Sequence, residues 1–156
     1  MENFFLDSLR MTKMTAAGRN ALAVVEKFVA ALLQDDLDAQ LALLQDEVTV
    51  DYAGRYGLGK MKRPKADAAD FHRALRRRIV IKGYNIYSAY GDANTVFILG
   101  DTTESIKETG FVLTAACIWI FTLEGGLIQK IAYLKESHAL YVFFSAIIEG
   151  RQKGAV

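Results

Sequence analysis

Tyr52 is the first side chain whose type and setting suggest chemistry. It continues an alternation in which Val48, Val50 and Tyr52 take one face of a predicted strand and Asp51 takes the other. This alternation directs Tyr52 inward and Asp51 toward water. Because a buried phenol needs a hydrogen-bond partner, Tyr52 could donate a proton or a hydrogen bond to a substrate carbonyl, alcohol or epoxide oxygen. The alternative is a structural tyrosine bonded to the backbone.

Asp101 is the second candidate, because it follows directly on the apolar segment 96–100. If Asp101 shares a strand face with Phe97 and Leu99, and this face lines an internal cavity, its carboxyl group points into that cavity. Burial there would raise the pKa of the carboxyl group toward a value that suits a general acid or base. The alternative is an exposed aspartate where the strand ends in a turn at residues 102–104.

The two histidines of the chain are further candidates for proton transfer. We expect His138 at the start of the last helix and His72 within the third. His138 joins the predicted catalytic residues, and a surface or structural role is the alternative for both.

The composition of the 156-residue chain favours one domain with a sizeable core. Its net charge of +1 provides no global field to recruit nucleic acid or membrane. The longest nearly unbroken apolar runs, 112–121 and 139–148, are about half as long as a bilayer-spanning helix. The apolar excess, 52% of all residues, must therefore line a partner surface or an internal cavity. The N-terminal segment lacks a secretory pattern, so we expect a cytoplasmic protein.

We expect no cofactor and no metal, because the sequence has no P-loop, no dinucleotide fingerprint and no His-rich spacing. The single cysteine, Cys117, lies in an apolar run and is predicted to be a small core residue. Arginines at 73 and 76–78 form a basic cluster that suits a helix C-terminus through the helix dipole. The alternative is a docking site for a phosphate-bearing substrate or an acidic carrier protein.

The periodicity of the sequence predicts the elements that position these groups. Helices are expected at residues 20–33, 35–44, 64–78 and 138–148, and strands at 47–52, 80–90, 95–103, 111–123 and 127–135. Residues 53–64 are expected to form a loop. A hairpin turn is expected at residues 124–126, where two glycines accept the positive φ of a tight turn.

This order of elements indicates an α+β fold. We expect a cone-shaped, curved antiparallel (mixed) sheet packed against three N-terminal helices, with a C-terminal helix. Residues 1–18 would form a flexible arm, residues 19–150 a single domain and residues 151–156 a tail.

Two parts of the sequence resemble a known superfamily. The segments VVEKFVAAL (24–32), DLD (36–38) and DEVTV (46–50) are similar to the opening of ketosteroid isomerases and SnoaL-like polyketide cyclases. LEGGLI (123–128) and YLKE (133–136) resemble their final hairpin. These enzymes belong to the nuclear-transport-factor-2-like superfamily. The resemblance covers about residues 20–140 and implies a conical ligand cavity and a homodimer formed through the outer face of the sheet.

The resemblance does not carry a complete catalytic set. Phe28 stands where ketosteroid isomerases have an oxyanion-donating tyrosine, Tyr52 where they have the aspartate base, and Trp119 close to their protonated aspartate. Asp101 could match one carboxylate of the epoxide-hydrolase branch, but Leu99 and Tyr133 stand where its arginine and second aspartate are expected. Scytalone dehydratases share a tyrosine like Tyr52, whereas their paired histidines have no counterpart here. The fold itself carries many activities.

These considerations predict a site inside the cone. The catalytic residues would be Tyr52, Asp101, Tyr133 and His138. The residues in contact with the substrate would be Phe28, Phe71, Phe97, Leu99, Thr103, Trp119, Phe121 and Lys135.

The expected function is proton-transfer chemistry without a cofactor. It would isomerise, dehydrate or cyclise a small apolar polyketide-, terpenoid- or steroid-like molecule. Tyr52 and Tyr133 would hold the substrate oxygen while Asp101 moves the proton. The alternative is a non-catalytic ligand-binding or dimerisation domain.

Overall fold

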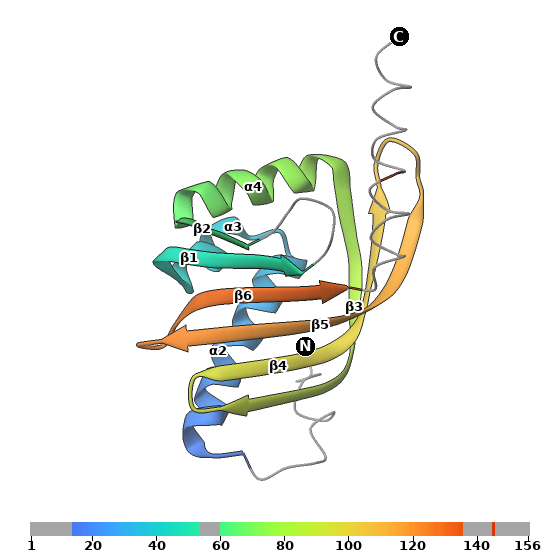
Figure 1. Cartoon of the computed structure of the whole chain (residues 1–156). Helices are drawn as coiled ribbons and strands as arrows, with labels where there is room; N and C mark the ends of the chain where they lie inside the picture. Colours follow the sequence, from blue (N-terminus) through green and yellow to red (C-terminus); the bar gives the residue numbers. More distant parts are fainter. Residues whose placement is uncertain (1–13, 54–59, 136–144, 146–156) are drawn as a thin grey trace.

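The computed structural model describes residues 14–53, 60–135 and 145 (Figure 1). Its elements are α2 (Ala16–Leu33), α3 (Leu37–Ala42), β1 (Leu44–Ala53), β2 (Lys60–Pro64), α4 (Lys65–Arg78), β3 (Ile79–Asp92), β4 (Thr95–Ile106), β5 (Val112–Glu124) and β6 (Leu127–Lys135). No helix within these ranges is both long and apolar enough to cross a membrane.

The strands form one six-stranded mixed sheet in the order β2-β1-β6-β5-β4-β3. β1 and β6 run parallel, and every other neighbouring pair is antiparallel. β3 carries two register irregularities against β4, one at residues 81–83 and one at 86–88. Such irregularities bend a strand, and Figure 1 shows the long strands β3, β4 and β5 curving together. The curved mixed sheet and the three helices that precede β3 confirm the predicted architecture.

Helix α2 packs on the concave side of this sheet, mainly against β3. Its buried residues include Leu22, Val25 and Val29, which recur at the helical spacing that the sequence predicted. Phe28 meets Phe121 of β5 edge to face, with ring centroids 5.9 Å apart. The core therefore lies between α2 and the inner face of β4, β5 and β6.

The first helix begins earlier than predicted. Thr15 caps α2, and its hydroxyl accepts a hydrogen bond of 3.0 Å from the Gly18 backbone N–H. Gly18 is buried against Gly91 of β3, and a Cβ on Gly18 would lie 2.1 Å from the Gly91 carbonyl oxygen. Met14 and Gly18, which belong to the predicted arm, therefore contact β3, the former through a hydrogen bond of 3.2 Å from the Gly91 backbone N–H to its sulfur. The remainder of the arm, the C-terminal helix and the tail lie outside the described residues, apart from residue 145.

The predicted loop at 53–64 contains a short strand, β2, that the sequence did not indicate. It pairs antiparallel with β1 from Glu47 opposite Pro64 to Asp51 opposite Lys60. A proline is tolerated there because β2 is an edge strand. The segment 60–64 has no apolar alternation, so only its pairing with β1 defines it as a strand.

The basic cluster at the end of α4 is largely used within the fold. Arg76 donates 2.6 Å to the Leu32 carbonyl oxygen at the end of α2 and 2.9 Å to the Asp35 carboxylate. Arg73 pairs with Asp70, and Arg78 approaches the carboxylate of Glu108, with 3.8 Å between their charged atoms. These contacts favour the structural interpretation of the cluster, and docking of a carrier protein stays a prediction.

Replacement of Gly91 by alanine should destabilise the domain, because a Cβ there would lie 2.3 Å from the Gly18 carbonyl oxygen. We expect a loss of roughly 1–3 kcal/mol in the free energy of unfolding, as for other overpacked sites. Gly83 lies on the same strand and has open space around its missing Cβ, so Gly83→Ala is the matched control and should change stability by less than about 0.5 kcal/mol. Urea unfolding of both variants tests this, and equal losses would contradict the close packing of α2 on β3.

Candidate functional site

The side chains of β4 alternate between the inner and outer faces of the sheet, and the phase of this alternation defines the site. Residues 96, 98, 100, 102 and 104 are buried on the inner face. Phe97 and Leu99 are instead 43% and 45% exposed. The prediction that these two residues line the cavity is therefore wrong. Every residue from 96 to 99 is apolar, so the sequence showed the strand but not which of its faces points inward.

Thr103 follows the same outward phase. Its hydroxyl group lies 2.9 Å from that of Thr114 on the neighbouring strand, and this contact is exposed. The prediction that Thr103 contacts a substrate inside the cone is therefore wrong as well.

Asp101 shares a face with Phe97 and Leu99 as predicted, but this is the outer face. Its carboxylate accepts a hydrogen bond from the Tyr87 hydroxyl group, and Tyr87 is exposed. This bond raises the pKa of Tyr87 above its ordinary value. Asp101 borders the inner pocket where β4 passes it, yet its carboxylate is held by Tyr87, so the structure does not supply the buried base that the sequence suggested.

Asp101 points away from the core, but other polar side chains of β4 and β6 do lie on the inner face of the sheet. Lys135 Nζ lies 3.0 Å from Glu104 Oε2, and both residues are buried. The Tyr133 hydroxyl group lies 3.2 Å from Thr102 Oγ1, and Thr102 is completely buried. We call Thr102, Glu104, Tyr133 and Lys135 the inner polar cluster.

The sequence did not predict two members of the inner polar cluster, Thr102 and Glu104. The predicted strand ended at residue 103, with a turn at residues 102–104 as the alternative, whereas β4 continues to Ile106. Glu104 and Thr102 consequently lie within the strand, on the same face as Ile98. The alternation of the strand beyond residue 101 was the signal that could have found them.

Tyr133 remains a neutral phenol at physiological pH. Burial raises its pKa well above the ordinary value, and the negative charge of Glu104 adds to the rise. Tyr133 can therefore donate or accept a hydrogen bond but cannot serve as an anionic base. Lys135, predicted to contact a substrate near the mouth of the cavity, is instead buried and paired with Glu104.

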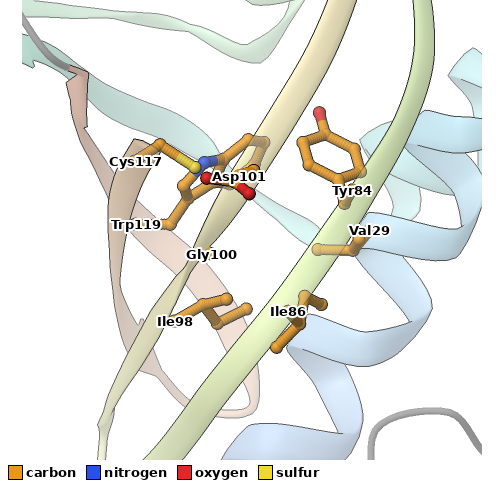
Figure 2. A pocket seen from close by; sticks show the side chains of 8 residues that line it. All are labelled: Val29, Tyr84, Ile86, Ile98, Gly100, Asp101, Cys117 and Trp119. Atoms are coloured by element: carbon orange, nitrogen blue, oxygen red, sulfur yellow. The ribbon is translucent and has the colours of Figure 1, made fainter. Parts of the chain in front are cut away.

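A small pocket lies beside this cluster, between α2 and strands β3 to β5 (Figure 2). Its lining residues are Val29, Tyr84, Ile86, Ile98, Gly100, Asp101, Cys117 and Trp119. The space in this pocket that a water molecule can occupy measures about 10 Å³, which suits about one water molecule. A volume of about 260 Å³ is reached only when all the space between atoms and the open solvent are included. Gly100 leaves the pocket without a side chain at that position, and a Cβ there would lie 2.3 Å from the Asn85 carbonyl oxygen.

Trp119 lines this pocket, as the resemblance implied. Its ring meets Tyr84 and Tyr133 edge to face, with centroid distances of 5.2 and 5.0 Å. The rings of Phe121 and Trp119 also contact each other, with ring centroids 5.7 Å apart. Phe121 and Phe28 were expected to contact a substrate, but the structure places both in the core and not in the wall of this pocket.

Cys117 is buried, as predicted, and also lines the pocket. Burial raises the pKa of its thiol, and the Trp119 N–H beside it partly opposes the rise. Figure 2 shows the indole nitrogen next to the Cys117 sulfur. Apart from this contact with sulfur, the Trp119 N–H has no hydrogen-bond partner within the part of the chain that the structure describes.

Several predicted site residues cannot be placed in this arrangement. His138 lies outside the described residues, as do the side chains of Tyr52, Phe71 and His72. The backbone of Tyr52 is described, and it lies opposite Tyr133 in the parallel pairing of β1 with β6. The expected roles of these residues stay predictions.

Comparisons with solved structures define the class of fold. An NTF2-like protein from Burkholderia xenovorans LB400 is 18% identical, with a TM-score of 0.69, and the match covers 80% of this chain and 95% of that one. An LEH-like epoxide hydrolase from M. tuberculosis is 20% identical, with a TM-score of 0.67 and coverage of 85% and 92%. A proposed isomerase from Bacillus subtilis is 17% identical, with a TM-score of 0.72 and coverage of 84% and 96%.

These likenesses confirm the fold that the sequence resemblance implied: the chain has the nuclear-transport-factor-2-like fold. No protein-family model matches the chain, and no curated protein sequence matches it either. The function must therefore be argued from the site itself.

The buried ion pair of the inner polar cluster can be tested by removing one partner at a time. Lys135→Met leaves the Glu104 carboxylate buried without its partner and should cost about 3–5 kcal/mol of unfolding free energy. The double variant Lys135→Met with Glu104→Leu should recover most of this loss, because no charge is then left unpaired.

Lys65→Met is the control, because the Lys65–Asp46 pair is exposed and should be worth less than about 1 kcal/mol. Urea unfolding at neutral pH measures all three variants. If the single and double variants lost equal stability, the two charges would not depend on each other.

Proposed function

We propose that the protein is an enzyme that moves protons on a small, mostly apolar molecule held against the inner face of the sheet. The observation that carries this proposal is the inner polar cluster, which sets a buried Glu104–Lys135 pair and the Tyr133–Thr102 contact among apolar residues. A buried ion pair is weak support for stability, because well-packed apolar side chains often replace such a pair without loss. A role in chemistry accounts better for its presence. The epoxide hydrolase and the proposed isomerase that share the fold support an enzymatic role.

Each member of the cluster has a role that suits its state. Tyr133, which stays protonated, donates a hydrogen bond to the substrate oxygen. Glu104 takes a proton from the carbon next to the substrate carbonyl group, and the resulting enolate charge is held by Tyr133. Thr102 orients the Tyr133 hydroxyl group. Glu104 thus replaces Asp101 as the proposed proton carrier.

The same set serves the three expected reactions. In an isomerisation, Glu104 returns the proton to a different carbon of the enolate. In a dehydration, the enolate expels a β-hydroxyl group, and the Lys135 ammonium donates the proton with which it leaves as water. In a cyclisation, the enolate carbon attacks a second carbonyl group of the substrate. Polyketide-, terpenoid- and steroid-like compounds carry the required carbonyl groups on apolar frameworks.

Tyr52 keeps its proposed role as a second hydrogen-bond donor to the substrate oxygen. Its backbone position opposite Tyr133 supports this assignment. Tyr52→Phe should then lower turnover by about 100-fold or more.

Activity assays with enones and β-hydroxy ketones test the proposal directly. Tyr133→Phe and Glu104→Gln should each lower kcat by about 100-fold or more, because each removes an acid–base or oxyanion-stabilising group. Tyr90→Phe is the matched control, since Tyr90 is exposed and pairs with the outward-facing Phe97. Circular dichroism and urea unfolding confirm that each variant is folded. Full activity of folded Tyr133→Phe would remove the inner polar cluster from the mechanism.

A non-catalytic ligand-binding domain is the second candidate. It is favoured by the neutralisation of Glu104 by Lys135, which gives the carboxylate a partner before any substrate arrives. A ligand that co-purifies with the protein and leaves chemically unaltered after incubation would support it.

We also propose that two copies associate through the outer face of the sheet. Leu99, Ile118 and Leu134 lie directly opposite one another on β4, β5 and β6, and all three are exposed. Together with Phe97 they form an apolar row that a two-fold axis could place against its copy.

Ile118→Glu should break this association, because it places a charge in the centre of the apolar row. Light scattering should give twice 17.3 kDa for the wild type and 17.3 kDa for the variant. Ala23→Glu is the control, since Ala23 is exposed on α2 and not on the outer sheet face. A monomeric wild type would contradict the proposed dimer.

A further inference from the structure

The carboxyl group of Glu26, on α2, is half-buried and lacks a hydrogen-bond partner. Its Oε1 atom is buried and makes no hydrogen bond with the residues that the structure describes. Burial raises the pKa of this carboxyl group above its ordinary value. Because buried polar groups in proteins are nearly always hydrogen-bonded, this exception calls for a reason. Neither the proposed proton transfer nor the proposed dimer uses Glu26.

Glu26 lies on the side of α2 that packs along β3. The buried residues Gly18, Leu22 and Val29 recur at helical spacing, and Glu26 falls within the stripe that they form. At one end of this stripe Gly18 meets Gly91 of β3. At the other end Val29 lines the pocket together with residues of β3 (Figure 2). The Glu26 carboxyl group therefore lies beside the contact between α2 and β3, about one helical turn before the pocket.

The titratable groups around Glu26 do not stabilise its charge. Tyr84 is the titratable residue of β3 that lines the pocket. The other titratable residues of β3 are all exposed: Lys82, Tyr87, Tyr90 and Asp92. Arg19 and Lys27 of α2 are exposed as well. On the inner face of β4 and β6, the charged groups of the inner polar cluster are paired with each other. An opposite charge close to Glu26 would lower its pKa, whereas burial raises it.

The pocket beyond Val29 is too small for the proposed substrate. The space that a water molecule can occupy there measures about 10 Å³, which suits about one water molecule. A larger molecule reaches the inner face of the sheet only if the elements that cover this face move apart. Because α2 packs mainly against β3, movement of α2 away from β3 enlarges the pocket next to Val29.

We infer that ionisation of Glu26 releases α2 from β3 and opens the inner face of the sheet to substrate. When the carboxyl group is neutral, α2 stays packed on β3, as in the structure. When it is charged, the side chain turns into water and α2 separates from β3 beside Val29. This inference rests on the proposed function, because it describes how a substrate reaches the inner polar cluster.

The direction of the pH dependence follows from the burial of Glu26. The closed state binds the Glu26 proton more tightly than the open state, because the carboxyl group is buried only in the closed state. The closed state is therefore favoured at low pH, and a rise in pH above the ordinary pKa of glutamate shifts the balance toward the open state. Each unit by which burial raises the pKa corresponds to about a tenfold change in the ratio of open to closed protein.

Trp119 reports on this opening, because it is the only tryptophan of the chain and lines the pocket. Quenching of its fluorescence by acrylamide is measured on the full-length protein between about pH 4 and pH 8, a range that begins near the ordinary pKa of glutamate. We expect the quenching constant of the wild type to rise by about twofold or more over this range, as the open state becomes populated. Glu26→Gln keeps the shape of the side chain but cannot ionise, so its quenching constant should stay at the low-pH value of the wild type.

Glu124→Gln is the matched control. Glu124 is exposed beside the β5–β6 turn and accepts a hydrogen bond from the Gln129 side chain. Its replacement should leave the wild-type rise in quenching unchanged. Circular dichroism at each pH establishes that the proteins stay folded.

Two results would overturn the inference. The first is a wild-type quenching constant that does not change with pH. The second is an equal rise in the wild type and in Glu26→Gln, because the rise would then come from another titratable group. Since the wild-type measurement needs no variant, a misfolded Glu26→Gln would not remove the test.

The outcomes also separate this inference from the proposed enzymatic function. A rise in quenching that Glu26→Gln abolishes, without turnover of any enone or β-hydroxy ketone, would support the opening of α2 and count against the enzyme. Turnover that depends on Tyr133 and Glu104, with quenching that is independent of pH, would support the enzyme and overturn the role of Glu26.

Discussion

The close packing of α2 against the bent strand β3 is the constraint on which the rest of the structure depends. Gly18 and Gly91 bring the two backbones into direct contact at one end of the helix. From there α2 places Val25 and Val29 over the concave face of the sheet. Since this face is then covered by apolar side chains, each strand residue that points inward must be apolar or must find a partner within the protein. The pocket and the inner polar cluster both lie on this covered face.

The inner polar cluster satisfies that requirement by pairing across neighbouring strands. Glu104 and Thr102 come from β4, whereas Lys135 and Tyr133 come from β6, and the intervening strand β5 contributes Cys117 and Trp119. Each strand thus supplies alternate residues to one surface. Trp119 is the exception, because its N–H has no acceptor among the residues that the structure describes.

The elements of the fold could be predicted from the sequence, whereas much of the site could not. Apolar residues recur with a period of two in the strands and of 3.6 in α2. Because each period is read over many residues, an error at one position does not change the predicted element. Whether Asp101 points inward or outward depends on which alternate residues of β4 face the core. Because residues 96–99 are all apolar, the sequence could not show which of the two sets faces inward. The positions of Trp119 and Tyr133 on the inner face of the sheet were predicted from the family resemblance, because the composition of the strands does not show which face is the inner one. The partner of Lys135 could not be predicted, since it depends on the register of strands that are distant in the sequence.

The parallel pairing of β1 with β6 has a consequence for how the chain folds. β1 is made early in the sequence, yet its pairing partner β6 is the last described strand, and β2 joins the sheet only through β1. Such pairing between distant segments is slow to form, because a long loop must close before any contact is gained. On the ribosome, the edge of β1 that faces β6 must therefore stay unpaired until β6 has emerged. During synthesis this open strand edge can pair with other chains, so it is a place where the nascent chain can aggregate and where a chaperone can protect it.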